Sequence, residues 1–165
     1  MPQSESPVVQ QLDKITHHTF TLERSYPHKA SRVFAAFADP KKKLRWFAGG
    51  EGVVVNSYTL DFREGGFERT QFSHGGSPPA TNECLYFQIV PNERIVYAFH
   101  MVYGGRALTS SLASIELVEA ADGTSTLLRL TEQIAYLDGP DHNDNRIEGT
   151  RDLLERLGND LDLAD

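Results

Sequence analysis

The sequence predicts an α+β fold in which a long C-terminal helix lies across a curved antiparallel sheet. Between residues 53 and 136, apolar side chains recur at every second position in successive short stretches, and tight-turn residues separate these stretches. From Ile147 to Leu161 the apolar spacing changes to three and four, which is the period of one helix face. Strands joined by tight turns pair antiparallel, so we expect the helices to segregate from the sheet.

The first third of this fold is predicted to hold one strand and two short helices. Apolar side chains alternate along residues 18–26, as in a half-buried strand. From residue 29 they recur at three and four, which indicates a short helix. Asp39 is a good N-cap and Pro40 a good first residue for a second helix, which we expect to end near residue 47.

Six further strands are predicted before the long helix, giving a sheet of six to seven strands in all. Gly65 and Gly66 mark a turn or bulge, and Asp122 followed by Gly123 is the strongest two-residue hairpin signal in the sequence. The predicted strands cover residues 53–62, 67–72, 83–90, 95–103, 108–118 and 126–136.

Length and composition fit one domain and exclude several partners. For 165 residues we expect a flexible leader over residues 1–15 and a single domain over residues 16–165. The net charge of −7 argues against nucleic acid as a partner. No apolar run approaches the about 20 residues of a membrane-spanning helix, and the first residues lack a signal-peptide pattern. The single cysteine, Cys84, excludes an intrachain disulfide and suits a cytoplasmic location.

The motifs along the chain resemble one known family. Residues 24–47 look like its opening strand, helices and tryptophan, and Asp61-x-Arg63-x-Gly65-Gly66 looks like its turn motif. Residues 90–97 look like its Pro-x-x-Arg hairpin, and residues 123–157 like its last strand and closing helix. In this order they are similar to the START-like (SRPBCC) superfamily, and within it to bacterial relatives of the C-terminal domain of the activator of heat-shock protein 90 ATPase (AHSA-type).

The resemblance spans about residues 17–161 and implies a helix-grip (START-like, Bet v-like) fold. Members of the superfamily bind varied apolar ligands and some are cyclases or hydrolases, so the fold alone does not select a function. We expect no cofactor, and the resemblance is compatible with a homodimer.

In such a fold a ligand cavity lies between the concave sheet face and the long helix. Tyr97, Phe99 and Met101 share one face of a central strand, and further aromatic residues fall near the rim. Any one of them could instead fill an ordinary core, because half-buried strands are rich in aromatic residues. The predicted ligand-binding residues are Trp46, Phe62, Phe67, Arg69, Tyr97, Phe99, Met101 and Glu132.

Glu132 is the most informative polar residue, because its neighbours at positions 130 and 134 are apolar and share its strand face. Its carboxylate should therefore point inward, where a charge is costly unless paired and the pKa tends to rise. Arg69, on the same strand face as Phe67, is the expected partner. Glu132 and Arg69 are the candidate catalytic residues, as acid or base and electrostatic support. A purely structural Glu–Arg pair explains the same pattern.

Other polar signals are weaker. The basic run at residues 41–43 is expected to be a solvated helix face. Asp61 and Arg63 are expected to hold the glycine turn rather than touch a ligand. Gly149 interrupts a helix at a cost near ~1 kcal/mol, which suggests close approach of the helix to the sheet. Cys84 is expected to be a buried, inert thiol.

Metal chemistry is not expected from the sequence. The histidines lack a chelating spacing such as His-x-x-x-His, and a Cys-x-x-Cys pair is absent from the sequence. We therefore predict no metal.

Three functions are compatible with these observations. The first is non-catalytic binding of a small hydrophobic ligand. The second is an enzyme of the polyketide cyclase or hydrolase type that uses Glu132. The third is a protein-interaction or stress-related, co-chaperone-like module that engages a partner or a second copy through the outer sheet face.

Overall fold

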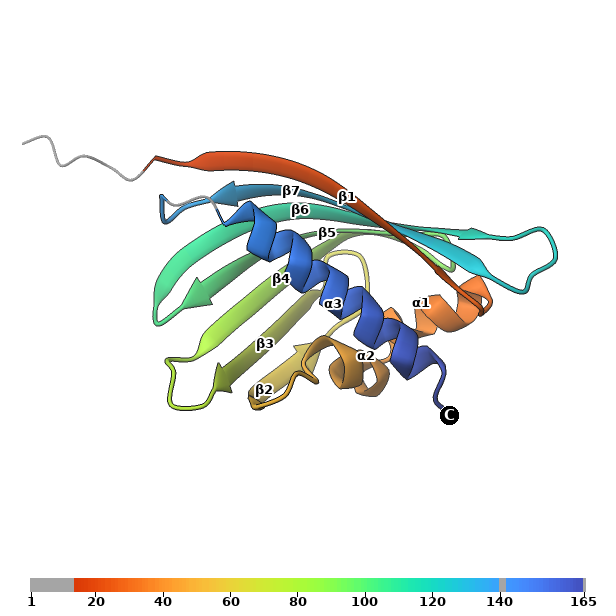
Figure 1. Cartoon of the computed structure of the whole chain (residues 1–165), viewed down its shortest axis with the longest axis horizontal. Helices are drawn as coiled ribbons and strands as arrows, with labels where there is room; N and C mark the ends of the chain where they lie inside the picture. The colour runs from red at the N-terminus through yellow and green to blue at the C-terminus, as the bar shows by residue number, and fades with distance from the viewer. Residues whose placement is uncertain (1–13, 140–141, 165) are drawn as a thin grey trace, which may run out of the picture.

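The computed structural model describes residues 14–139 and 142–164, so most of the expected leader lies outside the described residues. The described chain forms seven strands and three helices in the predicted order (Figure 1). They are β1 (Thr16–Tyr26), α1 (Ala30–Ala38), α2 (Pro40–Phe47), β2 (Val53–Leu60), β3 (Phe67–His74), β4 (Ala80–Val90), β5 (Arg94–Tyr103), β6 (Arg106–Glu119), β7 (Thr126–Tyr136) and α3 (Asn143–Leu161).

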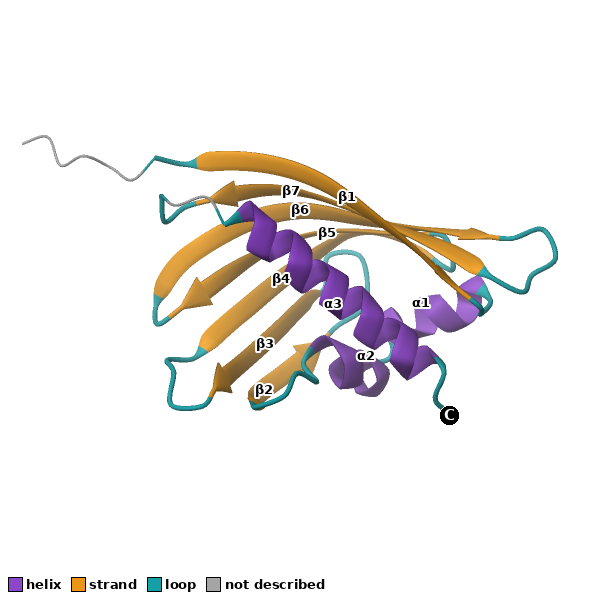
Figure 2. Ribbon diagram, viewed as in Figure 1, coloured by secondary structure: helices purple, strands orange, loops and turns teal. Residues whose placement is uncertain are grey.

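All seven strands join one curved antiparallel sheet in the order β1-β7-β6-β5-β4-β3-β2. β2 to β7 follow one another as a meander, and β1 pairs with β7 at one edge. α3 crosses the concave face, with α1 and α2 near its C-terminal end (Figure 2). The helix-grip α+β fold and the two short helices after the first strand are confirmed. No helix in the described part of the chain is long and apolar enough to cross a membrane.

The start of α2 is fixed by the predicted cap. The Asp39 carboxylate accepts hydrogen bonds from the backbone N–H groups of Lys41 and Lys42 at 2.8 and 3.1 Å, and Pro40 occupies the first turn. These bonds satisfy two of the amide groups that a helix start leaves without a partner. The short linker between the two helices therefore has a defined geometry, which sets where α2 meets the sheet.

The glycine turn after β2 is fastened to β4. Gly65 has a φ of +78°, a backbone region that favours glycine, and its N–H donates to the Tyr86 carbonyl at 2.8 Å. The Tyr86 N–H donates in return to the Gly66 carbonyl at 3.1 Å. A Cβ atom on Gly66 would lie 2.1 Å from the Asp61 carbonyl oxygen. Both glycines are therefore required by the backbone, as the sequence predicted.

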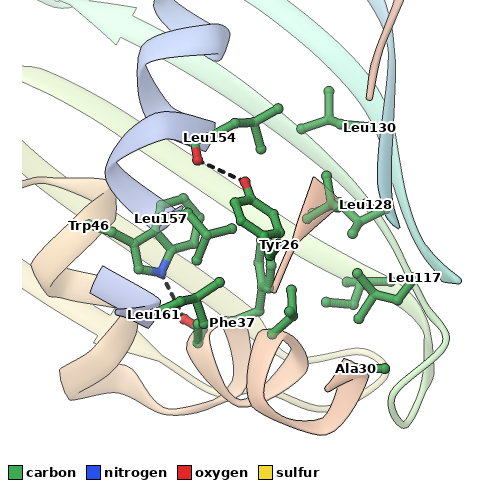
Figure 3. Close-up of a cluster of buried hydrophobic side chains, with 14 of the residues drawn as sticks. Tyr26, Ala30, Phe37, Trp46, Leu117, Leu128, Leu130, Leu154, Leu157 and Leu161 are labelled. Carbon is green, nitrogen blue, oxygen red and sulfur yellow. Dashed lines mark hydrogen bonds between the residues drawn. The ribbon is translucent and has the colours of Figure 1, made fainter. Parts of the chain in front are cut away.

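The C-terminal half of α3 is anchored in a solid core. Leu154, Leu157 and Leu161 are buried against β1, α1 and α2 (Figure 3). The Tyr26 hydroxyl donates to the Leu154 carbonyl at 2.7 Å, and the Trp46 indole N–H donates to the Ala36 carbonyl at 2.9 Å. Both polar tips are buried and satisfied, so the aromatic bodies add apolar area without an unpaired polar group.

The two glycines of α3 differ in how closely neighbouring side chains approach the helix backbone. A Cβ atom on Gly158 would lie 3.1 Å from the Tyr26 ring, whereas nothing lies within 4 Å of a Cβ atom on Gly149. The expected close approach at Gly149 is therefore wrong, because that part of the helix stands over open space. The close approach occurs at Gly158 instead.

This difference predicts opposite outcomes for two identical substitutions. Gly149→Ala should raise the free energy of unfolding by up to about 1 kcal/mol, because alanine is the better helix former and meets no obstacle. Gly158→Ala should gain clearly less or lose stability, because the new methyl group presses on Tyr26. Urea denaturation of both variants measures the difference, and equal gains would contradict it.

Candidate functional site

A cavity of about 410 Å³ lies between the concave sheet face and the N-terminal half of α3. This volume is within the range of small-molecule sites. The floor comes from β3 to β7 and the roof from α2 and α3. Its apolar wall consists of Phe37, Trp46, Phe47, Val53, Phe72, Tyr97, Phe99, Met101, Ala113, Ile115, Leu130, Leu153 and Leu154.

Strand register explains why these side chains meet. The concave face carries one cross-strand row that runs from Tyr86 through Tyr97 and Ala113 to Glu132. The neighbouring row contains Phe99, and the one beyond it contains Met101. Side chains two positions apart on a strand share a face, so three rows of concave residues build a continuous floor. Of the predicted ligand residues, the cavity wall includes Trp46, Tyr97, Phe99, Met101 and Glu132.

Phe62 lies behind the cavity wall rather than in it. Its ring packs edge-on against Phe34 at 5.6 Å and Tyr86 at 5.1 Å between ring centroids. It is half-buried against the main core. Phe62 therefore packs against Tyr86, which lies beside the cavity and not in its wall.

Phe67 and Arg69 point to the opposite face of the sheet. Phe67 is 64% exposed, and the Arg69 guanidinium pairs with Glu83 at 2.7 Å on the outer face. The predicted parity of β3, with the apolar Phe67 pointing inward, is wrong. The first two inward residues are Glu68 and Thr70, which are polar, and Phe72 follows them in the cavity wall. The predicted ion pair between Glu132 and Arg69 is therefore wrong.

Glu132 points inward as predicted, and its partners come from β6 and α3. It is 3% exposed, and its Oε1 accepts a hydrogen bond from the Ser111 hydroxyl at 2.6 Å. Arg146 Nε lies 3.3 Å from the same oxygen, but the N–H is not aligned for a hydrogen bond. The Arg146 guanidinium donates instead to Thr109 at 3.0 Å and lies over the Phe99 ring, 5.5 Å from its centroid.

A second buried charge pair was missed by the sequence reasoning. Lys43 is 7% exposed, and its ammonium lies 2.8 Å from a Glu68 carboxylate oxygen. The ammonium also lies 5.0 Å from the centroid of the Phe47 ring, within cation–π distance. The basic run is therefore not wholly solvated: Lys41 is exposed, but Lys43 enters the cavity wall. Helix spacing was the available signal, because positions 43 and 46 share one face of α2.

Glu68 is held by two tyrosines in addition to Lys43. Tyr86 donates to its Oε2 at 2.5 Å, and Tyr58 donates to its Oε1 at 3.1 Å. Burial raises the pKa of both hydroxyls well above its ordinary value, and the negative charge of Glu68 raises it further. Both tyrosines therefore remain hydrogen-bond donors throughout the physiological range.

Cys84 lies in the cavity wall and is buried, as predicted. Burial raises the pKa of its thiol to about 12, although the nearby Lys43 charge opposes this shift. At neutral pH the group is thus a thiol rather than a nucleophilic thiolate. Among the residues that the structure describes, there is no cluster of three histidine, cysteine or acidic side chains that could hold a metal ion.

Comparison with known proteins agrees with this architecture. The sequence model of the family described as "Activator of Hsp90 ATPase homolog 1-like protein" matches residues 27–161. The chain belongs to this family. The predicted superfamily is therefore confirmed. A comparison with curated proteins gave no match.

Solved structures of bacterial relatives share the family fold. The Mll3558 protein of Rhizobium loti is 41% identical with a TM-score of 0.82, and the match covers 89% of this chain and 99% of that one. An uncharacterized protein of Rhizobium leguminosarum is 35% identical with a TM-score of 0.84, covering 90% and 96%. CalU16 of Micromonospora echinospora, at 21% identity and a TM-score of 0.59, covers 90% and 84% and shares the fold alone.

Removing only one partner of the Lys43–Glu68 pair should destabilise the protein strongly. Lys43→Met leaves a buried carboxylate without its cation, so we expect the free energy of unfolding to fall by about 3 kcal/mol or more. Adding Glu68→Gln removes the stranded charge and should recover part of the loss. Lys41→Met on the exposed face should stay within about 0.5 kcal/mol of the parent chain. Urea denaturation of the four proteins tests this ordering.

Proposed function

We propose that the protein binds a small hydrophobic molecule in the cavity under the N-terminal half of α3, without changing it chemically. The observation that carries this proposal is the cavity itself, about 410 Å³ with a largely aromatic and aliphatic wall. Such walls gain free energy when an apolar ligand replaces water. The apolar packing of α3 is concentrated in its C-terminal half, whereas its N-terminal half contacts the sheet through polar groups such as Arg146.

The polar groups of the wall support binding rather than reaction. Glu68 is neutralised by Lys43 and held by two tyrosines, and Cys84 keeps its proton at neutral pH. An activated nucleophile would instead need a lowered pKa or an adjacent base. We place this binding function in the cytoplasm, which the single cysteine suits.

Filling the cavity should abolish binding. Ala113 is buried in the floor, so Ala113→Phe places an aromatic ring in the ligand volume. We expect the affinity for the neutral fluorescent probe N-phenyl-1-naphthylamine to fall at least about tenfold. Any molecule that accompanies the parent chain in native mass spectrometry should also disappear. The same spectra report the number of copies in the assembly.

The matched control is Ala98→Phe on the neighbouring strand. Ala98 alternates with the floor residues and pairs with Leu85 and Leu112, so its side chain lies on the outer face. Probe binding should be unchanged in this variant. Equal affinity of Ala113→Phe and the parent chain would rule out the cavity as the binding site.

An enzyme of the cyclase or hydrolase type is the second candidate, and the observation that favours it is the buried Glu132 carboxylate in the cavity wall. Glu132→Gln distinguishes the two. If Glu132 were an acid or base, molecules recovered from the variant would be unreacted substrate and would differ in mass from those of the parent chain. We expect identical masses in native mass spectrometry.

A further inference from the structure

Two buried carboxylates line the same cavity, and they differ in how well the protein satisfies them. A carboxylate offers about four lone-pair sites to hydrogen-bond donors. Glu68 receives three donors, from Lys43, Tyr86 and Tyr58, and both of its oxygens are engaged. Glu68 is therefore a structural group with few remaining acceptor sites for a ligand.

Glu132 is only half satisfied. Ser111 donates to Oε1, and within the described chain no donor reaches Oε2. The residue is only 3% exposed and lines the cavity, and Oε2 is not among the described buried atoms that lack a partner. Oε2 is therefore the acceptor that a ligand in the cavity can reach.

Two donors beside Glu132 are also without acceptors. Arg146 Nε is buried without a hydrogen-bond partner in the described residues, and the one hydrogen bond of this guanidinium goes from Nη2 to Thr109. The hydroxyl of Tyr97, which lines the cavity, makes no hydrogen bond with the described residues. Burial raises the pKa of Tyr97 well above its ordinary value, so this hydroxyl keeps its proton.

The register places Tyr97 and Glu132 in one row of the cavity floor. Tyr97 pairs with Ala113, and Ala113 pairs with Glu132, so the three lie in one row across β5, β6 and β7. Tyr97 and Glu132 are thus two strand spacings apart, roughly 10 Å between backbones. The small Ala113 side chain between them leaves room for a ligand group.

The charges beside Glu132 restrict which ligand groups can bind there. Glu132 and Arg146 carry opposite charges 3.3 Å apart, so the pair is neutral as a unit. An anionic or cationic ligand group would add an uncompensated charge to a buried site, which is strongly unfavourable. An uncharged hydroxyl can both donate to the carboxylate and accept from a neighbouring donor.

We propose that the ligand is an uncharged molecule with an aromatic or alicyclic body and a hydroxyl group that docks between Glu132, Arg146 and Tyr97. The hydroxyl donates to Glu132 Oε2 and accepts from Tyr97, with the Arg146 guanidinium beside Glu132. The body lies on the Phe99 side of the cavity. This inference rests on the proposed ligand-binding function and adds the chemistry that the cavity selects.

Three ligands of similar shape test the proposal by displacement of N-phenyl-1-naphthylamine from the parent chain at neutral pH. They are 2-naphthol, which carries the hydroxyl, 2-methylnaphthalene, which lacks it, and 2-naphthoate, which is anionic. We expect naphthol to bind at least about tenfold more tightly than methylnaphthalene, because it fills hydrogen bonds that the apolar analogue leaves unmade. Naphthoate should bind more weakly than naphthol.

Two variants test which side chains cause the preference for naphthol over methylnaphthalene. Tyr97→Phe removes only a hydroxyl, and Glu132→Gln removes the charge while keeping the shape. Each should reduce the preference for naphthol over methylnaphthalene at least about threefold, with methylnaphthalene affinity nearly unchanged. Tyr58→Phe is the matched control, because Tyr58 binds Glu68 from outside the cavity wall. Its naphthol preference should equal that of the parent chain. If Glu132→Gln does not fold, Tyr97→Phe decides alone.

The outcomes separate this inference from the function on which it rests. Equal binding of naphthol and methylnaphthalene, or tighter binding of naphthoate, would overturn the hydroxyl site and leave the hydrophobic cavity intact. The hydroxyl site would also be overturned if the preference for naphthol over methylnaphthalene persisted in both Tyr97→Phe and Glu132→Gln. Failure of the parent chain to bind the fluorescent probe and all three ligands would overturn both proposals.

Discussion

The asymmetric anchoring of α3 is the constraint on which the rest of the structure depends. Its C-terminal half packs against β1 and the two short helices, with the Tyr26–Leu154 hydrogen bond at the boundary. Gly158 permits that close approach, whereas Gly149 stands over open space. The N-terminal half is held above the sheet by this packed end and by Arg146, which reaches Thr109 and Glu132. The cavity is the volume that this geometry leaves unfilled.

Two ion pairs inside an apolar wall give the cavity its chemical character. Removing charges from water is costly, and the cost is offset only when partners and hydrogen bonds are well placed. The Lys43–Glu68 pair meets that condition through the added tyrosine hydroxyls, so it joins α2 to β3 as part of the structure. The Glu132–Arg146 pair meets it only in part, and our proposal of a recognition site rests on that difference. Proteins with this fold have many functions, so function has to be inferred from local differences such as the hydrogen bonding of these two pairs.

The fold was predictable from the sequence because each element depends on a local pattern. The alternation of apolar side chains, the Asp39 cap and the glycine turn are properties of neighbouring residues, and the structure confirms all three. The site was predictable only in part. Glu132 was found because its strand neighbours are apolar, but the parity of β3 was assigned wrongly. On that strand a buried glutamate alternates with an exposed phenylalanine, which reverses the usual hydrophobic signal.

By itself, therefore, the sequence determined the order and type of the elements and the inward direction of Glu132, because periodicity encodes which face of an element is buried. Only the tertiary structure decided which charged side chains pair with each other. Lys43 meets Glu68, and Arg146 meets Glu132, across segments 25 and 14 residues apart in the chain. Ion pairs of this kind depend on how helices cross the sheet, and a crossing geometry is not a property of any local stretch of residues.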